Sequence, residues 1–285
     1  MLMRVSAQGS WFKAVVMASL FIVFFVVQTR GQGSMTQEDE SRLYAESKQV
    51  NQFFRRFNGE EDEKGNRYYQ GDKHFRSAKL RKKYLGMLFD DNNAGIPAAL
   101  KIEFAKYITD NSESAIIDFH AGDWFSEVQA TFTMNGRDET VTLFMELEKD
   151  HLGFKWVIDR AQAYFLDPYF IRDTTRIGRF LHPMSHELDF MNFRKAFVNT
   201  DSVAQFAAKK FRPDHLSVFL YELKKGNLKF KSVEQVKFHF FQVKGWYFQI
   251  SEFNRPGYNS GWLISNLVKL NSKDDKDLLI RYIYK

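Results

Sequence analysis

The 285-residue sequence contains no cysteine and only five prolines. The lack of cysteine excludes disulfide bonds, thiolate metal sites, thiol nucleophiles and a lipid anchor on an N-terminal cysteine. Proline is scarce and low-complexity tracts are absent, so extended disorder is not expected. Motifs for a nucleophilic serine elbow, a phosphate-binding loop, a dinucleotide fold or a calcium loop are also missing. The chain must therefore be stabilised by its hydrophobic core.

Aromatic residues are abundant, with 30 phenylalanines and 16% aromatic residues overall. Such side chains build thick cores or line apolar cavities. The formal net charge is +6, but residues 1–31 carry three basic residues and no acidic one, so without them 41 basic residues fall to 38 against 35 acidic. This balance does not indicate nucleic-acid binding. The densest basic run, residues 79–83, is expected on the solvated face of a helix.

Residues 1–31 are typical of an export signal. The apolar run at residues 14–27 would rise only about 21 Å as a helix, which is short of the ~30 Å hydrocarbon core of a membrane. This length favours a cleaved signal peptide, and residues 32–41 then form a polar tether. The alternative is an uncleaved N-terminal anchor. We therefore predict an extracytoplasmic protein, periplasmic or secreted, or one anchored in the membrane and facing the periplasm.

Two stretches repeat the same β-pattern, Val128–Gln162 and Val236–Leu270. Each ends on a strand with a tryptophan, and Trp156 and Trp262 lie 106 residues apart (262 − 156). A period of this length predicts two similar domains in tandem and not a solenoid of small repeats.

In each half, apolar residues first recur at the spacing of a helix and then alternate as in a strand. This order predicts an α+β fold. Asn135-Gly136 predicts a tight hairpin in the first half. The expected domains are residues 42–167 and 186–285, joined by a linker at 168–185. Helices are expected near 43–57, 75–89 and after Pro97, and again at 185–197, 203–211 and 216–223. Strands are expected at 115–120, 128–134, 140–148, 154–163, 232–243, 246–253, 261–270 and 278–284.

The order of helices and strands resembles the nuclear-transport-factor-2-like fold, also called SnoaL-like or cystatin-like α+β. The resemblance is carried by Phe53-Phe54-Arg55-Arg56-Phe57, by the Val128–Glu148 hairpin with Lys155-Trp156-Val157-Ile158, and by Val236–Phe253 with Gly261-Trp262-Leu263-Ile264. It implies two cone-like domains in which a curved antiparallel sheet wraps around helices and forms an apolar pocket. Relatives with this fold are isomerases, dehydratases and hydrolases, or bind partners without catalysis.

Asp118 and His120 are candidates for proton transfer, because two residues of a strand at this spacing share a face. The same spacing also occurs on the wet face of a half-buried strand, which is the favoured interpretation. His182 and His186 have a spacing suited to a helical metal site, but Pro183 between them disfavours it. We therefore expect no metal and no cofactor.

The aromatic sheet faces carry the stronger functional signal. Phe240, Trp246 and Phe248 are expected to meet a ligand or partner, with Arg255 and Tyr258 on a neighbouring flexible loop. Packing of that face against the neighbouring domain is the simpler explanation, and contact with an external partner is weighed against it. The sequence thus predicts a non-enzymatic exported protein of the bacterial cell envelope that binds a partner protein or a small apolar ligand. It is not expected to bind nucleic acid. It is expected to contact a membrane only if the N-terminal segment is retained. The alternative function is an isomerase- or dehydratase-like enzyme.

Overall fold

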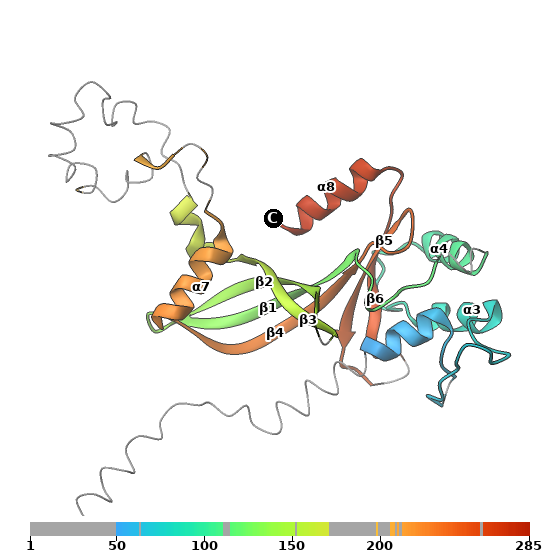
Figure 1. Ribbon diagram of the computed structural model, residues 1–285. Helices are drawn as coiled ribbons and strands as arrows, with labels where there is room; N and C mark the ends of the chain where they lie inside the picture. Colours follow the sequence, from blue (N-terminus) through green and yellow to red (C-terminus); the bar gives the residue numbers. More distant parts are fainter. Residues whose placement is uncertain are drawn as a thin grey trace, which may run out of the picture. The chain divides into compact units, whose positions relative to one another are not determined.

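The computed structural model of the chain is α+β, with one six-stranded antiparallel sheet (Figure 1). It describes residues 50–62, 64–110, 115–151, 153–170, 198, 206–208, 210, 213–256 and 259–285. The predicted export segment and tether lie outside the described residues. So do most of the predicted linker and of the helices expected at 185–197 and 203–211.

The described chain begins with a helix at residues 50–58. The other helices are α3 (Ala78–Met87), α4 (Ala98–Asp110), the 3-10 helix η1 (Tyr164–Phe170), α7 (His215–Lys225) and α8 (Lys273–Ile283). The strands are β1 (Trp124–Met134), β2 (Arg137–Asp150), β3 (Gly153–Gln162), β4 (Leu228–Phe240), β5 (Trp246–Phe253) and β6 (Gly261–Lys269). Positive φ angles of 52° at Asn135 and 78° at Gly136 form the predicted hairpin turn.

The strand order is β3-β2-β1-β4-β5-β6, so the sheet consists of two three-stranded meanders. The 106-residue offset relates β1 to β4, β2 to β5 and β3 to β6. The meanders meet through β1 and β4, which pair antiparallel from Trp124 opposite Phe240 to Met134 opposite Leu228. Both tryptophan-bearing hairpins therefore belong to one continuous sheet.

This arrangement differs from the predicted division into domains 42–167 and 186–285, each with a sheet of its own. The structure groups residues 49–285 as one compact unit. The physical reason is that β1 and β4 would each be the edge strand of a three-stranded meander. An edge strand leaves a row of backbone N–H and C=O groups unpaired, and pairing the two edges satisfies both rows.

The helices of each half pack on strands of the other half (Figure 1). Helix 50–58, α3 and α4 contribute Phe53 and Phe104 to a core that contains Phe248 of β5. On the same face, α7 contributes Phe219 to a second core with Phe132 of β1, and their rings lie 5.3 Å apart at 89°. On this face, helices of the first half cover the second meander, and α7 of the second half covers the first meander together with η1.

A fragment of residues 186–285 alone is expected not to fold cooperatively. It would expose Phe240, Phe248 and Ile264, and burying each such side chain stabilises a fold by about 1.5–3 kcal/mol. Chemical denaturation of the fragment, followed by circular dichroism, measures this directly. A cooperative unfolding transition of the isolated fragment would contradict the exchange of helical cover.

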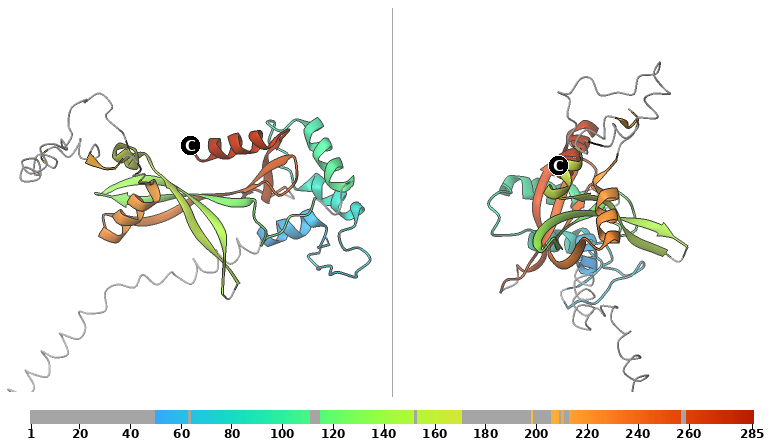
Figure 2. Two further views of the ribbon diagram at one scale, coloured as in Figure 1. Left: turned by 45° about the horizontal axis from the view of Figure 1, so that its top comes forward. Right: turned by 90° about the vertical axis from the view of Figure 1, so that its left-hand side faces the viewer.

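The prediction of a strand at residues 278–284 is wrong, because α8 occupies residues 278–283 and Tyr284 is its C-cap. A capping box starts this helix: Asp275 N donates to Ser272 Oγ at 3.1 Å, and Ser272 N donates to Asp275 Oδ2 at 3.1 Å. Leu279, Ile280 and Ile283 recur at helical spacing and pack against a third core, on the sheet face opposite Phe248. Figure 2 shows α8 and helix 50–58 on opposite sides of the strands.

The basic run at residues 79–83 is not wholly solvated, because Arg81 is fully buried. Its Nη2 donates to the carbonyl of Ala115 at 2.6 Å, and its Nε donates to the carbonyl of Phe57 at 3.4 Å. Burial lowers the pKa of Arg81 to about 10. Gly59 has a φ of 72°, and a Cβ there would lie 2.8 Å from Arg81 Cγ. The buried guanidinium thus satisfies two carbonyls outside α3, and the adjacent turn requires glycine.

Candidate functional site

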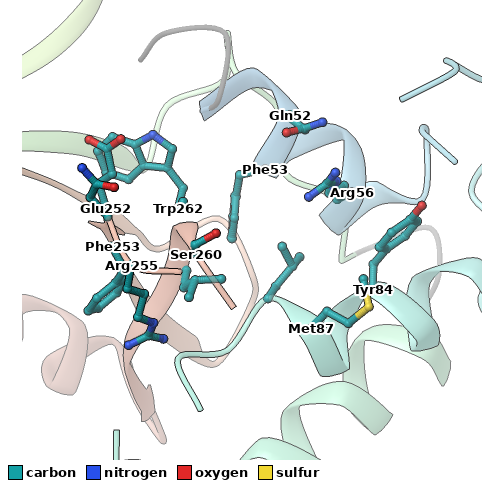
Figure 3. A pocket seen from close by; sticks show the side chains of 14 residues that line it. Gln52, Phe53, Arg56, Tyr84, Met87, Glu252, Phe253, Arg255, Ser260 and Trp262 are labelled. Carbon is teal, nitrogen blue, oxygen red and sulfur yellow. The ribbon is translucent and has the colours of Figure 1, made fainter. Parts of the chain in front are cut away.

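A cavity of about 390 Å³ lies between helix 50–58, α3 and the ends of β5 and β6 (Figure 3). Its apolar wall is formed by Phe53, Leu88 and Trp262, which are buried, and by Met87, which is 40% exposed. The alternation of β6 and the helical spacing of residues 50–58 bring these side chains together. The volume falls at the low end of the roughly 300–1,000 Å³ that is typical of small-ligand sites.

Three polar atoms of the cavity lining are buried and have no hydrogen-bond partner among the described residues. They are Arg56 Nε, Tyr84 Oη and Trp262 Nε1. Tyr84 is 1% exposed and Trp262 is 6% exposed. An unsatisfied buried polar group costs about 1–3 kcal/mol, so such groups are uncommon in folded proteins. All three atoms belong to residues that line one cavity.

Arg56 shares its acidic partner with a second arginine. Glu61 is 1% exposed, and its Oε2 accepts from Arg55 Nε at 2.7 Å, whereas its Oε1 lies 3.5 Å from Arg56 Nε. Gln52 Nε2 donates to Glu61 Oε1 at 2.7 Å. Two guanidinium groups therefore depend on one carboxylate, and the better hydrogen bonds go to Arg55 and Gln52.

Tyr84 lies beneath this guanidinium, with Arg56 Cζ 5.9 Å from the centre of its ring. Burial raises the pKa of Tyr84, and the charge of Arg56 opposes that shift only in part. The phenol is therefore neutral near pH 7 and carries a proton to donate. In Figure 3, Arg56 and Tyr84 lie on one side of Phe53, and Trp262 lies on its other side.

Arg255, predicted on the basis of sequence as a rim residue, lines the cavity. Its Nη2 donates to Asp90 Oδ1 at 2.6 Å, and its Nε donates to the carbonyl of Asn259 at 2.6 Å. Asn259 Nδ2 in turn donates to the carbonyl of Phe89 at 2.7 Å. These bonds attach the rim to the segment that follows α3. Tyr258, the other predicted rim residue, lies outside the described residues.

Phe240, Trp246 and Phe248 lie in the core, with exposures of 0–2%. The ring of Phe248 stacks on that of Phe240 at 4.8 Å and on that of Phe57 at 5.5 Å. Helix 50–58 and α4 cover this face of the sheet. These three residues lie in the core between the sheet and the helices and do not line the cavity. Their predicted contact with a ligand or partner stays a prediction.

Asp118 and His120 lie in a turn before β1, so the strand predicted at 115–120 is wrong. Asp118 Oδ1 accepts from the backbone N–H of His120 at 2.9 Å, which is a turn contact. Both residues are exposed, and neither lines the cavity described above. Asp118 borders a separate open cleft together with Arg55, Arg67 and other charged groups. The apolar pocket needed to couple the pair for proton transfer is not formed around them.

The sequence interpretation missed a buried polar triad on the face of the sheet that α8 covers. Glu127 Oε2 accepts from His239 Nε2 at 2.9 Å, and His239 Nδ1 lies 2.9 Å from Tyr247 Oη. Burial lowers the pKa of His239 and raises that of Tyr247. A neutral His239 therefore donates from Nε2 to the carboxylate and accepts at Nδ1 from the phenol. The spacing Phe238-His239-Phe240 in a strand indicated at most a buried histidine.

Within the described ranges, no group of three or more histidine, aspartate or glutamate side chains is placed to hold a metal ion. None of the helices described here is long and apolar enough to cross a membrane. His182 and His186, considered above as metal ligands, lie outside the described residues.

No protein-family model and no curated protein sequence matches this chain. The site is accordingly assigned from its geometry, and the cavity around Arg56, Tyr84 and Trp262 is the candidate.

Proposed function

We propose that this chain is a non-enzymatic binding protein that takes a small, largely apolar ligand in the cavity between helix 50–58, α3 and the ends of β5 and β6. The observation that carries the proposal is the set of three buried, unsatisfied donors around that cavity. A ligand that accepts from them would remove their desolvation cost, and this cost is a source of binding free energy.

Binding is favoured over isomerase- or dehydratase-like catalysis because the proposed acid–base pair lies elsewhere. Asp118 and His120 do not line the cavity, and its described lining contains no histidine. Neutral Tyr84 and ionised Arg56 act as donors, which suits recognition of a ligand.

The cellular setting is proposed from the sequence of residues 1–31. An apolar segment of that length preceded by basic residues supports export to the cell envelope, with cleavage or with retention as an anchor. Sequencing the N-terminus of the mature protein separates these outcomes. A retained Met1 would exclude cleavage.

We further propose that the two halves are copies of one plan of the nuclear-transport-factor-2-like kind. The support is the 106-residue offset, which relates every strand of the first meander to one of the second. In this proposal the copies are joined through their first strands and exchange helices.

Filling the cavity is expected to abolish ligand binding. Met87→Trp places an indole in the cavity from the partly exposed face of α3 and should weaken binding of the neutral apolar dye N-phenyl-1-naphthylamine by about tenfold or more. Fluorescence titration measures the affinity. The matched control is Ile102→Trp, which adds the same ring at a position that is 69% exposed on α4. Unchanged dye binding by Met87→Trp would refute this site.

A further inference from the structure

Resting on the proposed function, we infer that the ligand is an amphipathic monocarboxylic acid, whose carboxylate binds Arg56 and Tyr84 and whose apolar body lies along Phe53 and Leu88. Three independent features of the cavity lead to this class: the kind of unsatisfied atom, the local charge and the nature of the wall.

All three unsatisfied atoms are donors. Arg56 Nε–H and Trp262 Nε1–H donate and cannot accept, and the neutral phenol of Tyr84 has a proton to give. The ligand must therefore present acceptor atoms. A carboxylate offers two oxygens with about four acceptor positions, so it serves neighbouring donors that one hydroxyl oxygen could not serve equally.

The charge at the Arg56 end calls for an anion. Arg55 and Arg56 share the single carboxylate of Glu61, and Arg55 holds it at 2.7 Å against 3.5 Å for Arg56. The charges of this trio sum to +1, beside a phenol 5.9 Å from the guanidinium carbon. The carboxylate of Glu252 lines the cavity on the Trp262 side of Phe53 (Figure 3). Hydrogen bonds between charged partners are about twice as strong as neutral ones, and a partly desolvated guanidinium gains most from them.

One wall of the cavity beside this charged end is apolar, whereas Glu252, Asn254, Arg255 and Ser260 line the part near Trp262. Phe53 is 2% exposed and Leu88 is 4% exposed, and Met87 adds a flexible thioether side chain that adapts to an irregular apolar body. The indole N–H of Trp262 lies across Phe53 from Arg56 (Figure 3). It could donate to a second oxygen at the far end of the ligand. A cavity of about 390 Å³ restricts the ligand to a small molecule.

Paired probes test this class by isothermal titration calorimetry on the full chain: octanoate and octan-1-ol, which share an alkyl chain and differ in charge. Octanoate is expected to bind roughly tenfold more tightly than octan-1-ol near pH 7. Tyr84→Phe removes one donor and should weaken octanoate binding by about fivefold to tenfold while leaving octan-1-ol unchanged. The control is Tyr282→Phe, the same change at a tyrosine that is 75% exposed on α8.

The outcomes separate the two levels of the proposal. Equal affinity for both probes, or an equal loss of both in Tyr84→Phe, overturns the carboxylate assignment but leaves the cavity a ligand site. Failure of octanoate to bind overturns the assignment as well. If N-phenyl-1-naphthylamine also fails to bind, the proposed binding function fails with it. Arg56→Gln, which removes the charge and keeps a donor, should reduce the preference for octanoate over octan-1-ol to about threefold or less.

Discussion

Replacing Phe248 by alanine should lower the free energy of unfolding by about 3–5 kcal/mol, the cost typical of deleting a buried aromatic ring. Phe248 is fully buried in β5 at the point where the helices of the first half meet the strands of the second. Its ring contacts those of Phe53, Phe57 and Phe104, with centres 5.5–6.3 Å apart, and stacks on Phe240 at 4.8 Å. Close-packed neighbours on all sides relax little into the space that is left.

Urea denaturation at equilibrium measures the change in unfolding free energy. The matched control is Phe230→Ala, which removes the same ring from β4 at a position that is 61% exposed and should cost less than about 1 kcal/mol. Equal losses in the two variants would contradict the placement of the principal core beneath helix 50–58 and α4.

Glu127→Gln is the second substitution expected to have a large effect, with a loss of about 2–3 kcal/mol in unfolding free energy. The Glu127 carboxylate accepts from Lys237 Nζ and from His239 Nε2, both at 2.9 Å. A glutamine amide accepts from only one of these donors, because its other atom is itself a donor. His239 is 1% exposed, so a hydrogen bond lost there is not replaced by bulk water. The control is Glu148→Gln, whose carboxylate is 60% exposed and lies 3.9 Å from Lys155. It should change stability by less than about 0.5 kcal/mol.

The hydrogen-bonded pair of Glu127 and His239 also makes the stability of the fold depend on pH. Burial lowers the pKa of His239 below its ordinary 6.5, so below that pH the unfolded chain binds a proton that the folded chain does not, and stability falls. For Glu127, burial alone would raise the pKa, but the bonds from His239 and Lys237 outweigh it and lower the pKa to about 2. Its contribution is therefore present above pH 4.5 and is lost as the pH falls towards 2.

Both groups thus act in the same direction, and the unfolding free energy should decrease from pH 7 to pH 3. Glu127→Gln should flatten the part of this decrease below pH 4.5, because the titrating carboxylate is gone. Urea denaturation at a series of pH values checks this. An identical pH profile in the variant and the wild type would contradict the proposed role of the carboxylate.

The local elements could be predicted from sequence because their determinants are local. Asn135-Gly136 favours positive φ angles, and the alternation in the two tryptophan-bearing stretches is that of half-buried strands. The helices at 78–87, 98–110 and 215–225 follow from apolar spacing. At the end of the chain the predicted strand is wrong, because Leu278–Tyr284 is almost wholly apolar and fits either period. The capping box at Ser272 and Asp275 was the available signal for a helix.

The joining of the two halves could not be predicted in the same way. Pairing of β1 with β4 connects residues about a hundred positions apart, and nothing in either strand distinguishes a free edge from a paired one. The repeat alone therefore predicts two domains. The exchange of helices follows from that pairing. Because β1 and β4 join the two meanders into one sheet, the helices of either half can pack on the strands of the other.

The candidate site was only partly visible in the sequence. Arg255 was expected at a ligand-contacting rim because it lies in a glycine-containing loop, and it lines the cavity. Arg56 was noted only as part of an aromatic helix motif, and its spacing of three from Phe53 was the signal that both face one cavity. Tyr84 and Trp262 carry no such signal, because their lack of a partner depends on contacts between distant segments.

The indole N–H of Trp262 reports most directly on whether the cavity is a ligand site. In a ¹H–¹⁵N spectrum of the full chain, with the Trp262 signal assigned by Trp262→Phe, octanoate should shift that signal in a saturable way. The indole of Trp124 already donates to the carbonyl of Phe119 at 3.1 Å, so its signal should stay in place. A Trp262 signal that does not move while octanoate binds, or moves no more than that of Trp124, would contradict the assignment of the cavity.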